Sequence, residues 1–279
     1  MQKGNLKEVL EKKLNKKEKA VFIKSFDTLG NIALIEIPKE LEKKQKLIGD
    51  TIIKLNKNIK TVCKISGPHK GKYRLQPLKI IAGEKNFTAE YKESNCRFIF
   101  DVRKVFFSPR LSNERIRISN LIKKDETVGC FFAGAGPFPI VFSKNSEMKK
   151  AFAVELNPQA VKYMKKNIEL NKCKEKVEVF LGDVNKIAGT KLKNSCDRIV
   201  MPMPHGGETF LYATLKALKK GGIIHFYQVL EKDTAFETAI ERAKKECEKQ
   251  KRKFKLLDKR KVRPFSAAKM QVVIDFRAD

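Results

Sequence analysis

The 279-residue sequence lacks the features of several protein classes. No apolar run approaches the roughly 18 to 20 residues that a helix needs to cross a bilayer. The N-terminal region is charged from the start and lacks the apolar segment of a secretory signal. We therefore expect no membrane contact and a cytoplasmic location. Hydrophobic residues make up 42% and charged residues 33%, a balance that also excludes intrinsic disorder.

The sequence is also poor in groups that bind metals. Its three histidines are spread along the chain, and its six cysteines include no Cys-x-x-Cys pair. A zinc site needs several such ligands close together, so we expect no metal. The cysteines are expected to be reduced, buried or inert thiols: Cys63, Cys96, Cys130, Cys173, Cys196 and Cys247.

Acidic residues are scarce relative to basic ones. The chain has 61 Lys and Arg against 32 Asp and Glu, a net charge of +29 at pH 7. Basic contacts with a polyanion release counterions, so this excess favours a nucleic acid partner. A lysine-rich proteome or a heat-adapted surface is the alternative, but heat adaptation raises Lys and Glu together. The run from Lys249 to Lys255 and the lysine-rich N-terminal helix are candidate contacts for an RNA backbone.

Residues 1–107 have the pattern of a small mixed α/β domain in which strands outnumber helices, and we expect this domain to position the substrate. The spacing predicts a surface helix, two strands around a turn at 27–30, and a second helix, over 5–19, 22–37 and 40–56. Four short strands are expected at 61–65, 78–82, 87–91 and 96–105.

Residues 108–279 alternate strands with helices, which predicts a mainly parallel sheet covered by helices on both faces. Seven strands are expected at 127–132, 150–155, 177–181, 198–201, 222–228, 254–262 and 270–276. Helices are expected at 110–123, 139–143, 158–171, 208–218 and 234–252. The fold class is thus α/β: a Rossmann-like domain with a seven-stranded sheet, preceded by the smaller domain.

Three successive strand ends carry groups that suit an adenosine-containing cofactor. The run Phe132 to Gly136 (FAGAG) follows a strand, and its GxG bend lets a ligand approach bare backbone. Glu155 ends the next strand, where a carboxylate can accept both hydroxyls of a ribose. Asp183 follows the third strand, where it can accept from an adenine amino group. Each group alone suits an ordinary turn or helix cap, but their order and spacing together predict the cofactor site.

The residues after the glycines bear on which cofactor binds. A dinucleotide site usually has a third glycine, and Pro137 and Phe138 would crowd a pyrophosphate there. A sulfonium amino acid needs no anion site, which favours S-adenosyl-L-methionine over NAD. The candidate cofactor-binding residues are Phe132, Ala133, Gly134, Gly136, Pro137, Phe138, Glu155, Leu156, Asn157, Asp183, Pro202 and Pro204.

These residues resemble the archaeal and eukaryotic tRNA (guanine37-N1)-methyltransferases, which methylate the guanine next to the anticodon. The most specific stretches are Val105 to Arg115 (VFFSPRLSNER), Phe132 to Phe138, Glu155 to Pro158 and Gly222 to His225. The resemblance covers nearly the whole chain. It implies a Rossmann-like methyltransferase that uses S-adenosyl-L-methionine and acts on the anticodon stem-loop of tRNA; we expect a monomer.

In that family the Glu of SPRLxxER is taken as the general base, and nearby Arg residues handle the guanine oxygen. The resemblance thereby implies catalytic roles for Glu114, Arg110 and, from the preceding domain, Arg74. The chemistry agrees, because N1 of guanine must lose a proton and a guanidinium stabilises the charge that develops on O6. Without the resemblance, Glu114 suits an exposed first-turn glutamate, and the arginines suit phosphate contacts.

Two positions depart from the family pattern. Cys130 stands where an Asp usually precedes the glycine loop, which removes one acceptor for the cofactor. Pro202-Met203-Pro204 replaces Asn-Leu-Pro, so the Asn side chain that helps to orient the guanine is missing. The Pro202 carbonyl can accept from the base but cannot donate. These departures predict a slower reaction or a different substrate base.

Two alternatives stay open. The related wybutosine-synthesising aminocarboxypropyltransferases use the same cofactor, but they tend to lack Arg110 and the pair Pro137-Phe138, so methyl transfer is favoured. A non-catalytic RNA-binding protein with a degenerate cofactor site is the other, suggested by Cys130 and Pro202. His225 is expected to be a satisfied core histidine. A flipped base would need an aromatic neighbour, for which the candidates are Phe106, Phe107 and Tyr73.

Overall fold

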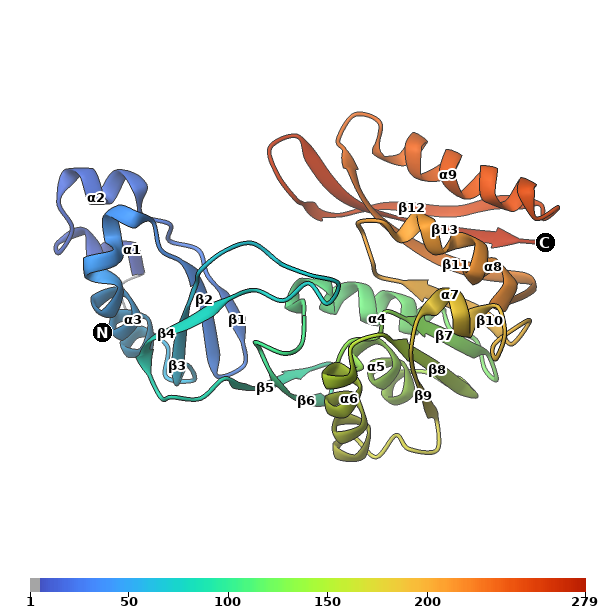
Figure 1. Cartoon of the computed structure of the whole chain (residues 1–279), viewed down its shortest axis with the longest axis horizontal. Coiled ribbons are helices and arrows are strands. Elements are labelled where there is room, and N and C mark those ends of the chain that lie inside the picture. Colours follow the sequence, from blue (N-terminus) through green and yellow to red (C-terminus); the bar gives the residue numbers. More distant parts are fainter. Residues whose placement is uncertain (1–5) are drawn as a thin grey trace. The chain divides into compact units, whose positions relative to one another are not determined.

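The computed structural model describes residues 6–279, which form two compact units (Figure 1). The first contains the described residues up to Glu93 together with Arg97–Pro109, and the second contains Ser94–Cys96 and Arg110–Asp279. Two contacts tie Ser94–Cys96 to the second unit. Nδ2 of Asn145 donates to the Ser94 carbonyl at 3.1 Å, and the Cys96 thiol donates to the Ile140 carbonyl at 3.9 Å.

The first unit is a four-stranded sheet with helices packed against it. The strand order is β1-β2-β3-β4; β2 and β3 are parallel, and the outer pairs are antiparallel. The strands are β1 (Asp27–Leu29), β2 (Ile32–Glu36), β3 (Thr61–Ile65) and β4 (Leu78–Gly83). The helices are α1 (Leu6–Glu11), α2 (Lys16–Val21), the 3-10 helix η1 (Lys39–Lys44) and α3 (Gln45–Leu55). A separate pair of strands follows, β5 (Thr88–Glu93) and β6 (Cys96–Asp101).

The prediction of one surface helix over 5–19 is wrong. Residue 5 lies outside the described residues, and the rest forms α1 and α2. Asn15 accepts the Glu18 N–H at 2.9 Å and Glu18 accepts the Asn15 N–H at 2.8 Å, a capping box that starts a new helix. Leu6, Leu10 and Leu14 lie in the core of the unit instead of on its surface.

The predicted turn at 27–30 also lies two residues too early. Asp27–Leu29 is strand β1, and the chain reverses at Gly30 and Asn31 before β2. Gly30 has φ of 61°, and a Cβ there would overlap the Glu90 carbonyl. The glycine is therefore the turn residue that the backbone requires.

The second unit contains the expected seven-stranded sheet, in the order β12-β13-β11-β10-β7-β8-β9. The run from β11 to β9 is parallel, and β13 is antiparallel to both β11 and β12. The strands are β7 (Thr127–Phe131), β8 (Lys150–Glu155), β9 (Val177–Leu181), β10 (Cys196–Met201), β11 (Leu218–Glu231), β12 (Phe254–Pro264) and β13 (Lys269–Ala278). The predicted fold class, a Rossmann-like domain after a smaller α/β domain, is confirmed.

Helices cover both faces of this sheet (Figure 1). One side carries α4 (Ser112–Leu121), α5 (Pro137–Asn145) and α6 (Pro158–Leu170), and the other carries α7 (Val184–Ala188), α8 (Leu211–Ala217) and α9 (Ala235–Lys249). Short 3-10 helices, η2 (Pro109–Leu111) and η3 (Gly207–Phe210), precede α4 and α8. The second set packs on a largely apolar face that includes Ile199, Ile224 and Ile274. Because side chains alternate along a strand, Arg198, His225 and Asp275 lie on the opposite face, toward α4.

The six cysteines are free and buried, as expected. Among residues 6–279, no helix combines the length and apolar character needed to cross a membrane. Within the same residues, no three His, Cys, Asp or Glu side chains are grouped so that they could hold a metal ion.

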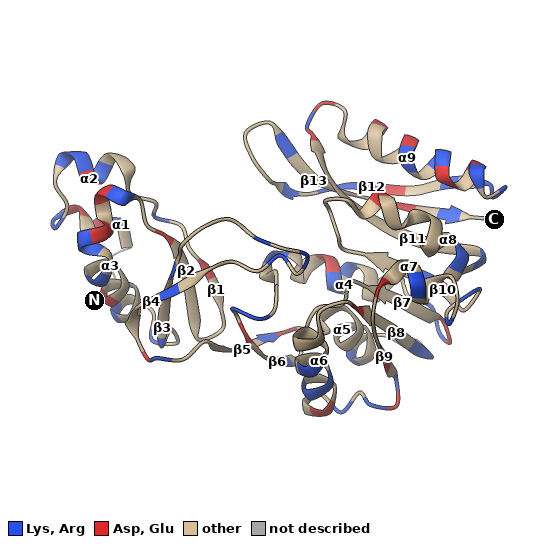
Figure 2. Ribbon diagram, in the orientation of Figure 1, with Lys and Arg blue, Asp and Glu red and all other residues tan. Residues whose placement is uncertain are grey.

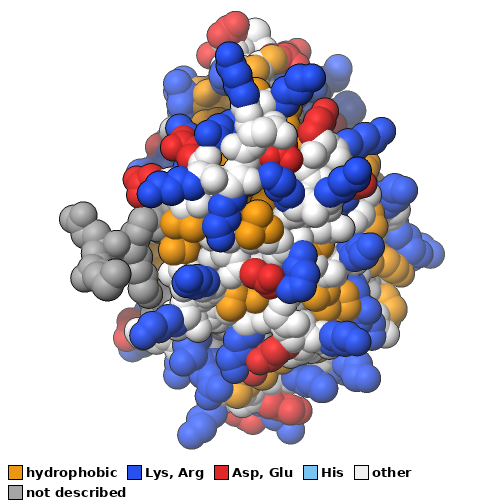
Figure 3. All heavy atoms as spheres, turned by 90° about the vertical axis from the view of Figure 1, so that its left-hand side faces the viewer, with side chains coloured by type: hydrophobic (Ala, Val, Ile, Leu, Met, Phe, Trp, Pro, Cys, Tyr) orange, Lys and Arg blue, Asp and Glu red, His pale blue; other side chains and the backbone are white. Residues whose placement is uncertain are grey.

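Basic side chains are spread over both units (Figure 2). On the face shown in Figure 3, Lys and Arg surround small hydrophobic patches with acidic side chains among them, and they form no single stripe. The basic side chains are therefore distributed over both units rather than gathered in one of them.

Candidate active site

The loop after β7 is a left-handed bend. Phe132, Gly134 and Gly136 have φ of 55°, 57° and 87°. A Cβ on Gly136 would lie 2.8 Å from Cγ of Met164 on α6, so both the backbone and the packing require glycine there. Nδ2 of Asn167 donates to the Ala135 carbonyl at 3.0 Å and fixes the loop to α6. The loop thus offers a rigid stretch of backbone to a ligand.

Glu155, at the end of β8, joins this loop to the next one. Its Oε2 accepts the Gly134 N–H at 2.8 Å, and its Oε1 accepts the Asn157 N–H at 2.7 Å. Burial raises the pKa of Glu155, although the N–H groups of Asn157 and Gly134 oppose this. Each oxygen keeps a second lone pair, so the carboxylate can accept both hydroxyls of a ribose.

An apolar pair of side chains lies beside this carboxylate. Leu156 is 39% exposed and Leu181 is 56% exposed, and Leu181 is the register partner of Glu155 across β8 and β9. Asp183 follows and starts α7, with its Oδ1 accepting the Asn185 N–H at 2.8 Å. Two apolar side chains and a nearby carboxylate match the apolar faces and polar edge of adenine. The residues present therefore fit the adenosine portion of S-adenosyl-L-methionine.

The other candidate residues around the glycine loop are packed into the fold. Ala133 is buried, and the Phe132 ring contacts that of Phe210, with centroids 4.9 Å apart. Pro137 begins α5. The Phe138 side chain is buried beneath the Arg115 guanidinium, 5.5 Å from the ring centroid, so its ring packs between α4 and α5. Phe138 can face a ligand through its backbone only.

The two departures from the family pattern have different surroundings. Cys130 is fully buried, and burial raises the pKa of its thiol, so it stays neutral and does not replace a carboxylate acceptor. After β10, the Pro204 carbonyl accepts the Val229 N–H at 2.8 Å, which joins this segment to β11. Pro202 is the first residue beyond the strand.

Glu114, in the first turn of α4, is largely buried rather than exposed, with 13% of its side chain accessible. Its Oε2 accepts the Tyr227 hydroxyl at 2.6 Å and Nη2 of Arg117 at 2.9 Å. Nε of Arg117 lies 3.0 Å from Oε1. Arg117 also donates through Nη1 to Oδ2 of Asp275 at 2.6 Å. The carboxylate is thus aimed at the sheet and held there.

The sequence reasoning missed the partners of Glu114. Arg117 had a readable signal, because residues three apart on a helix face each other. Tyr227 and Asp275 had none, since they lie 113 positions from Glu114 and 158 positions from Arg117 along the chain. His225, expected as a satisfied core histidine, is fully buried and bonded at both ring nitrogens.

Glu114 meets the sheet at the same edge as the cofactor loops. Cys130 pairs with Val200, and Met201 pairs with Phe226, so Tyr227 lies just beyond the carboxyl ends of β7 and β10. Ligands of open α/β sheets bind outside that edge. The second unit therefore brings the candidate base and the candidate cofactor residues to one end of the sheet.

The two candidate arginines belong to different units. Arg110 lies in η2 of the second unit and is exposed. Arg74 lies in the first unit with φ of 53°, and burial lowers its pKa. Among the candidate aromatics of the first unit, Phe106 is 45% exposed and Tyr73 is half-buried, whereas Phe107 is buried against Phe100. Phe107 is therefore a core residue.

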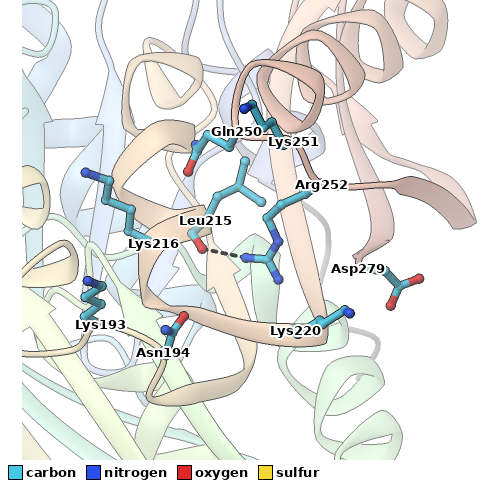
Figure 4. A pocket seen from close by; sticks show the side chains of 9 residues that line it. All are labelled: Lys193, Asn194, Leu215, Lys216, Lys220, Gln250, Lys251, Arg252 and Asp279. Atoms are coloured by element: carbon cyan, nitrogen blue, oxygen red, sulfur yellow. Dashed lines mark hydrogen bonds between the residues drawn. The ribbon is translucent and has the colours of Figure 1, made fainter.

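A basic pocket lies at the opposite end of the sheet, where Asn194 precedes β10 (Figure 4). Arg252, from the predicted basic run, donates to the carbonyls of Leu215, Leu218, Lys219 and Ala278 at 2.6 to 3.0 Å and is thus structural. The other basic residues lining the pocket are Lys193, Lys216, Lys220 and Lys251, with Asp279 as the acidic one.

Comparison with protein families agrees with this geometry. A model of the TRM5/TYW2 methyltransferase domain matches residues 89–257, and a model of the TYW2 N-terminal domain matches residues 6–86. The chain belongs to the TRM5/TYW2 methyltransferase family. The resemblance inferred from the sequence motifs is thereby confirmed.

The curated relatives have names of three kinds: guanine(37)-N(1)-methyltransferases, a 4-demethylwyosine(37)-methyltransferase and an aminocarboxypropyltransferase. The chain is 38% identical over 253 residues to tRNA (guanine(37)-N(1))-methyltransferase Trm5b of Pyrococcus abyssi, covering 91% of this chain and 74% of that protein. It is 33% identical over 207 residues to tRNA(Phe) (4-demethylwyosine(37)-C(7)) aminocarboxypropyltransferase of Methanocaldococcus jannaschii, covering 74% and 80%.

Solved TRM5 structures share the fold over nearly the whole chain. The complex of aTrm5 and tRNALeu has a TM-score of 0.86 at 30% identity, covering 100% of this chain and 79% of that one. Methanocaldococcus jannaschii Trm5 in complex with adenosine has a TM-score of 0.82 at 29% identity, covering 98% and 78%.

Proposed function

We propose that this protein transfers the methyl group of S-adenosyl-L-methionine to N1 of guanine 37, next to the anticodon of tRNA. The observation that carries the proposal is the placement of Glu114, a largely buried carboxylate at the edge of the sheet where the cofactor loops lie. The proposal is supported by relatives that bear this activity in their names and by the fold shared with aTrm5 bound to tRNALeu.

In the proposed reaction, Glu114 accepts the proton of guanine N1. Loss of that proton places negative charge on O6, and the guanidinium of Arg110 stabilises this charge in the transition state. Arg74, in the first unit, stays a candidate for the same role. When bound, S-adenosyl-L-methionine supplies an electrophilic methyl group, which N1 takes up as the carbon–sulfur bond breaks and its electron pair stays on sulfur. The adenosine portion is held by Glu155, Leu156, Leu181 and Asp183. The loop from Phe132 to Phe138 and the residue Asn157 lie beside these side chains. The segment Pro202–Pro204 follows β10 and lies at the same edge of the sheet.

The basic pocket supplies a candidate contact for the RNA backbone. Lys193, Lys216, Lys220 and Lys251 surround it, and lysine contacts to phosphates give affinity without sequence choice (Figure 4). Arg252 fixes the backbone at the pocket, because its guanidinium donates to the carbonyls of Leu215 and Lys219. A tRNA substrate fits the +29 net charge of the chain and the expected cytoplasmic location.

Aminocarboxypropyl transfer is the second candidate, favoured by the match of residues 6–86 to a TYW2 N-terminal domain. Arg110 and the pair Pro137-Phe138 favour methyl transfer, because the resemblance associates them with the methyltransferases. A non-catalytic RNA-binding role is disfavoured, since Glu155, Leu156, Leu181 and Asp183 together fit the cofactor.

The test separates these activities by the label transferred. Purified protein is incubated with tRNA transcripts carrying G or A at position 37 and, separately, with wyosine-type tRNA carrying 4-demethylwyosine there, using S-adenosyl-L-methionine labelled either in the methyl or in the carboxyl group. Methyl label on the G37 transcript alone supports the proposal. Carboxyl label on wyosine-type tRNA indicates the second candidate, and neither label on any tRNA, with no cofactor binding, indicates the non-catalytic role.

A further inference from the structure

The hydrogen bonds at Glu114 distinguish its two oxygens. Oε2 accepts the Tyr227 hydroxyl at 2.6 Å, Nη2 of Arg117 at 2.9 Å and Nε of Arg117 at 3.1 Å. Oε1 is approached by Nε of Arg117 alone, at 3.0 Å. A carboxylate oxygen has two lone pairs in its plane, so Oε2 is saturated and Oε1 retains one acceptor position.

Tyr227 is a permanent donor. Its ring is fully buried in β11, and burial together with the Glu114 carboxylate raises the pKa of the phenol well above its usual value. The hydroxyl therefore stays protonated at any pH at which the protein acts. A buried, uncharged donor of this kind fixes an acceptor without supplying a competing charge.

Arg117 is held in turn from the other side. Asp275, on β13, accepts Nη1 of Arg117 at 2.6 Å and Nδ1 of His225 at 2.7 Å. Burial alone would raise the pKa of Asp275, but His225 and Arg117 hold it below its usual value. Glu114 and Asp275 thus both accept hydrogen bonds from the guanidinium of Arg117. These bonds fix the plane of the Glu114 carboxylate.

The protonation of His225 follows from its neighbours. Nη1 of Arg198 lies 2.9 Å from Nε2, and a guanidinium can only donate, so Nε2 carries no proton. The ring proton is therefore on Nδ1, where it is donated to Asp275. Burial lowers the pKa of His225 and agrees with a neutral ring.

The cluster has one more negative than positive charge. Arg198 is paired with Glu126 through Nε and Oε2 at 2.7 Å. The charged members are the carboxylates Glu114, Asp275 and Glu126 and the guanidiniums Arg117 and Arg198, so three negative and two positive charges leave a net charge of −1. A proton that arrives from the substrate removes that excess charge.

We propose that Tyr227 and the Arg117–Asp275 pair are positioning residues that hold Glu114 by Oε2 and leave Oε1 as the atom that accepts the substrate proton. This inference rests on the proposed function, in which Glu114 takes the proton of guanine N1. The N–H bond breaks, its electron pair stays on N1, and the proton bonds to Oε1. Tyr227, Arg117 and Asp275 touch Glu114 or each other and act through that carboxylate.

Substitution of either positioning residue should slow the chemical step and spare binding. Tyr227→Phe removes one hydrogen bond from Oε2, so the single-turnover rate of methyl transfer at saturating cofactor and tRNA should fall about 5- to 20-fold. Asp275→Asn replaces the charged acceptor of Arg117 by a neutral amide oxygen, and it should lower the same rate by a similar factor. A merely structural role for these residues would change stability and leave the rate of the folded protein in place.

The first readout is the carbon-13 signal of the Glu114 side-chain carboxyl at one fixed pH, in protein labelled at glutamate without cofactor or tRNA, assigned by its loss in Glu114→Gln. Tyr212→Phe, at an exposed tyrosine on α8, and Asp197→Asn, at the amino end of β10, are the matched controls. A changed carboxyl signal in Tyr227→Phe and in Asp275→Asn, with none in the controls, supports the inference. An unchanged signal in Tyr227→Phe overturns it.

Single-turnover methyl transfer to G37 tRNA at saturating cofactor and tRNA gives the second readout. The rate should fall in Tyr227→Phe and in Asp275→Asn, with tRNA and cofactor affinities unchanged. If the wild-type protein transfers no methyl group, the proposed function fails while the carboxyl signal still decides the positioning. If the wild type is active and both variants react at its rate, the positioning inference alone fails.

Discussion

Glu155 and Gly134 join the two cofactor loops: the Gly134 N–H donates to Oε2 of Glu155 at 2.8 Å, across 21 positions of the chain. The other oxygen accepts the Asn157 N–H, so one carboxylate fixes the loops after β7 and β8. The same oxygens are the acceptors proposed for the ribose. Organisation of the loops and recognition of the cofactor thus depend on one side chain.

Replacing Glu155 by Gln should weaken S-adenosyl-L-methionine binding about 10- to 100-fold, because an amide accepts at one position and loses the charge-assisted bonds. Isothermal titration calorimetry measures this directly. Glu178→Gln, at an exposed glutamate on β9 that is paired with Lys150 on β8, is the matched control and should bind normally. Equal affinities for Glu155→Gln and the wild type would contradict the assignment.

Cofactor affinity should also depend on pH through Glu155. Its pKa is raised by burial, and the charged form is the one that accepts both ribose hydroxyls. Affinity is therefore full at pH values above this raised pKa and declines as the pH falls through it, at a higher pH than for an ordinary glutamate. Calorimetry from pH 8 to pH 5 checks this, and Glu155→Gln should abolish the decline. A decline that persists in that variant would point to another group.

Substitution of Gly136 by Ala should both destabilise the protein and weaken cofactor binding. At φ of 87° any side chain is strained, and the Cβ would also overlap Met164. Gly206→Ala is the control, because Gly206 has φ of 74° and open space around it. Thermal unfolding should show a loss of about 1 kcal/mol in the control and at least about 1 kcal/mol more in Gly136→Ala. Equal losses would show that packing against α6 has no role.

The basic pocket should contribute to tRNA affinity through charge. Changing Lys193, Lys216 and Lys220 together to Gln should weaken binding at low salt and reduce the salt slope by about two to three units, since each lost phosphate contact contributes about 0.7 to 0.9. The matched control changes the exposed lysines of the α6 region, Lys162, Lys165 and Lys174, to Gln. Fluorescence anisotropy at several salt concentrations checks this. Equal slopes in both triple variants would remove the pocket from the interface.

Restoring the Asn of the family pattern, by Pro202→Asn, should speed methyl transfer. The side chain would add a donor and an acceptor just beyond β10, level with Tyr227. One added hydrogen bond to the base predicts a single-turnover rate about 2- to 10-fold higher on G37 tRNA. Pro204→Asn is the comparison, and no gain is expected there because the Pro204 carbonyl is already bonded to Val229. A slower Pro202→Asn variant would mean that the proline suits this active site.

The periodicity of the sequence predicted most of the fold. Strand β3 lies at the predicted 61–65, because its β-branched run is bounded by clear breakers. The short helix α7 was missed: five residues carry too little periodicity, although Asp183 at its N-cap was noticed for another role. The break between α1 and α2 was also missed, although Asn15 and Glu18 have the spacing of a capping box.

The candidate site was predictable where its parts follow one another along the chain. The glycine loop, Glu155 and Asp183 each end a strand, so alternation of strand and helix places them at one edge. The partners of Glu114 were not predictable in this way. Tyr227 and Asp275 meet it only through the pairing of β11 with β13 and the packing of α4 on their shared face.

The most direct test of the account is single-turnover methyl transfer to G37 tRNA by Glu114→Gln. The amide keeps the size of the side chain but cannot take the N1 proton, so the rate should fall about 100- to 10,000-fold. Cofactor affinity should stay close to that of the wild type, whereas thermal stability should fall because a buried charged partner of Arg117 is lost, and the assay is run below the unfolding temperature of the variant. A Glu114→Gln variant that methylates G37 at the wild-type rate would contradict the central role of this carboxylate.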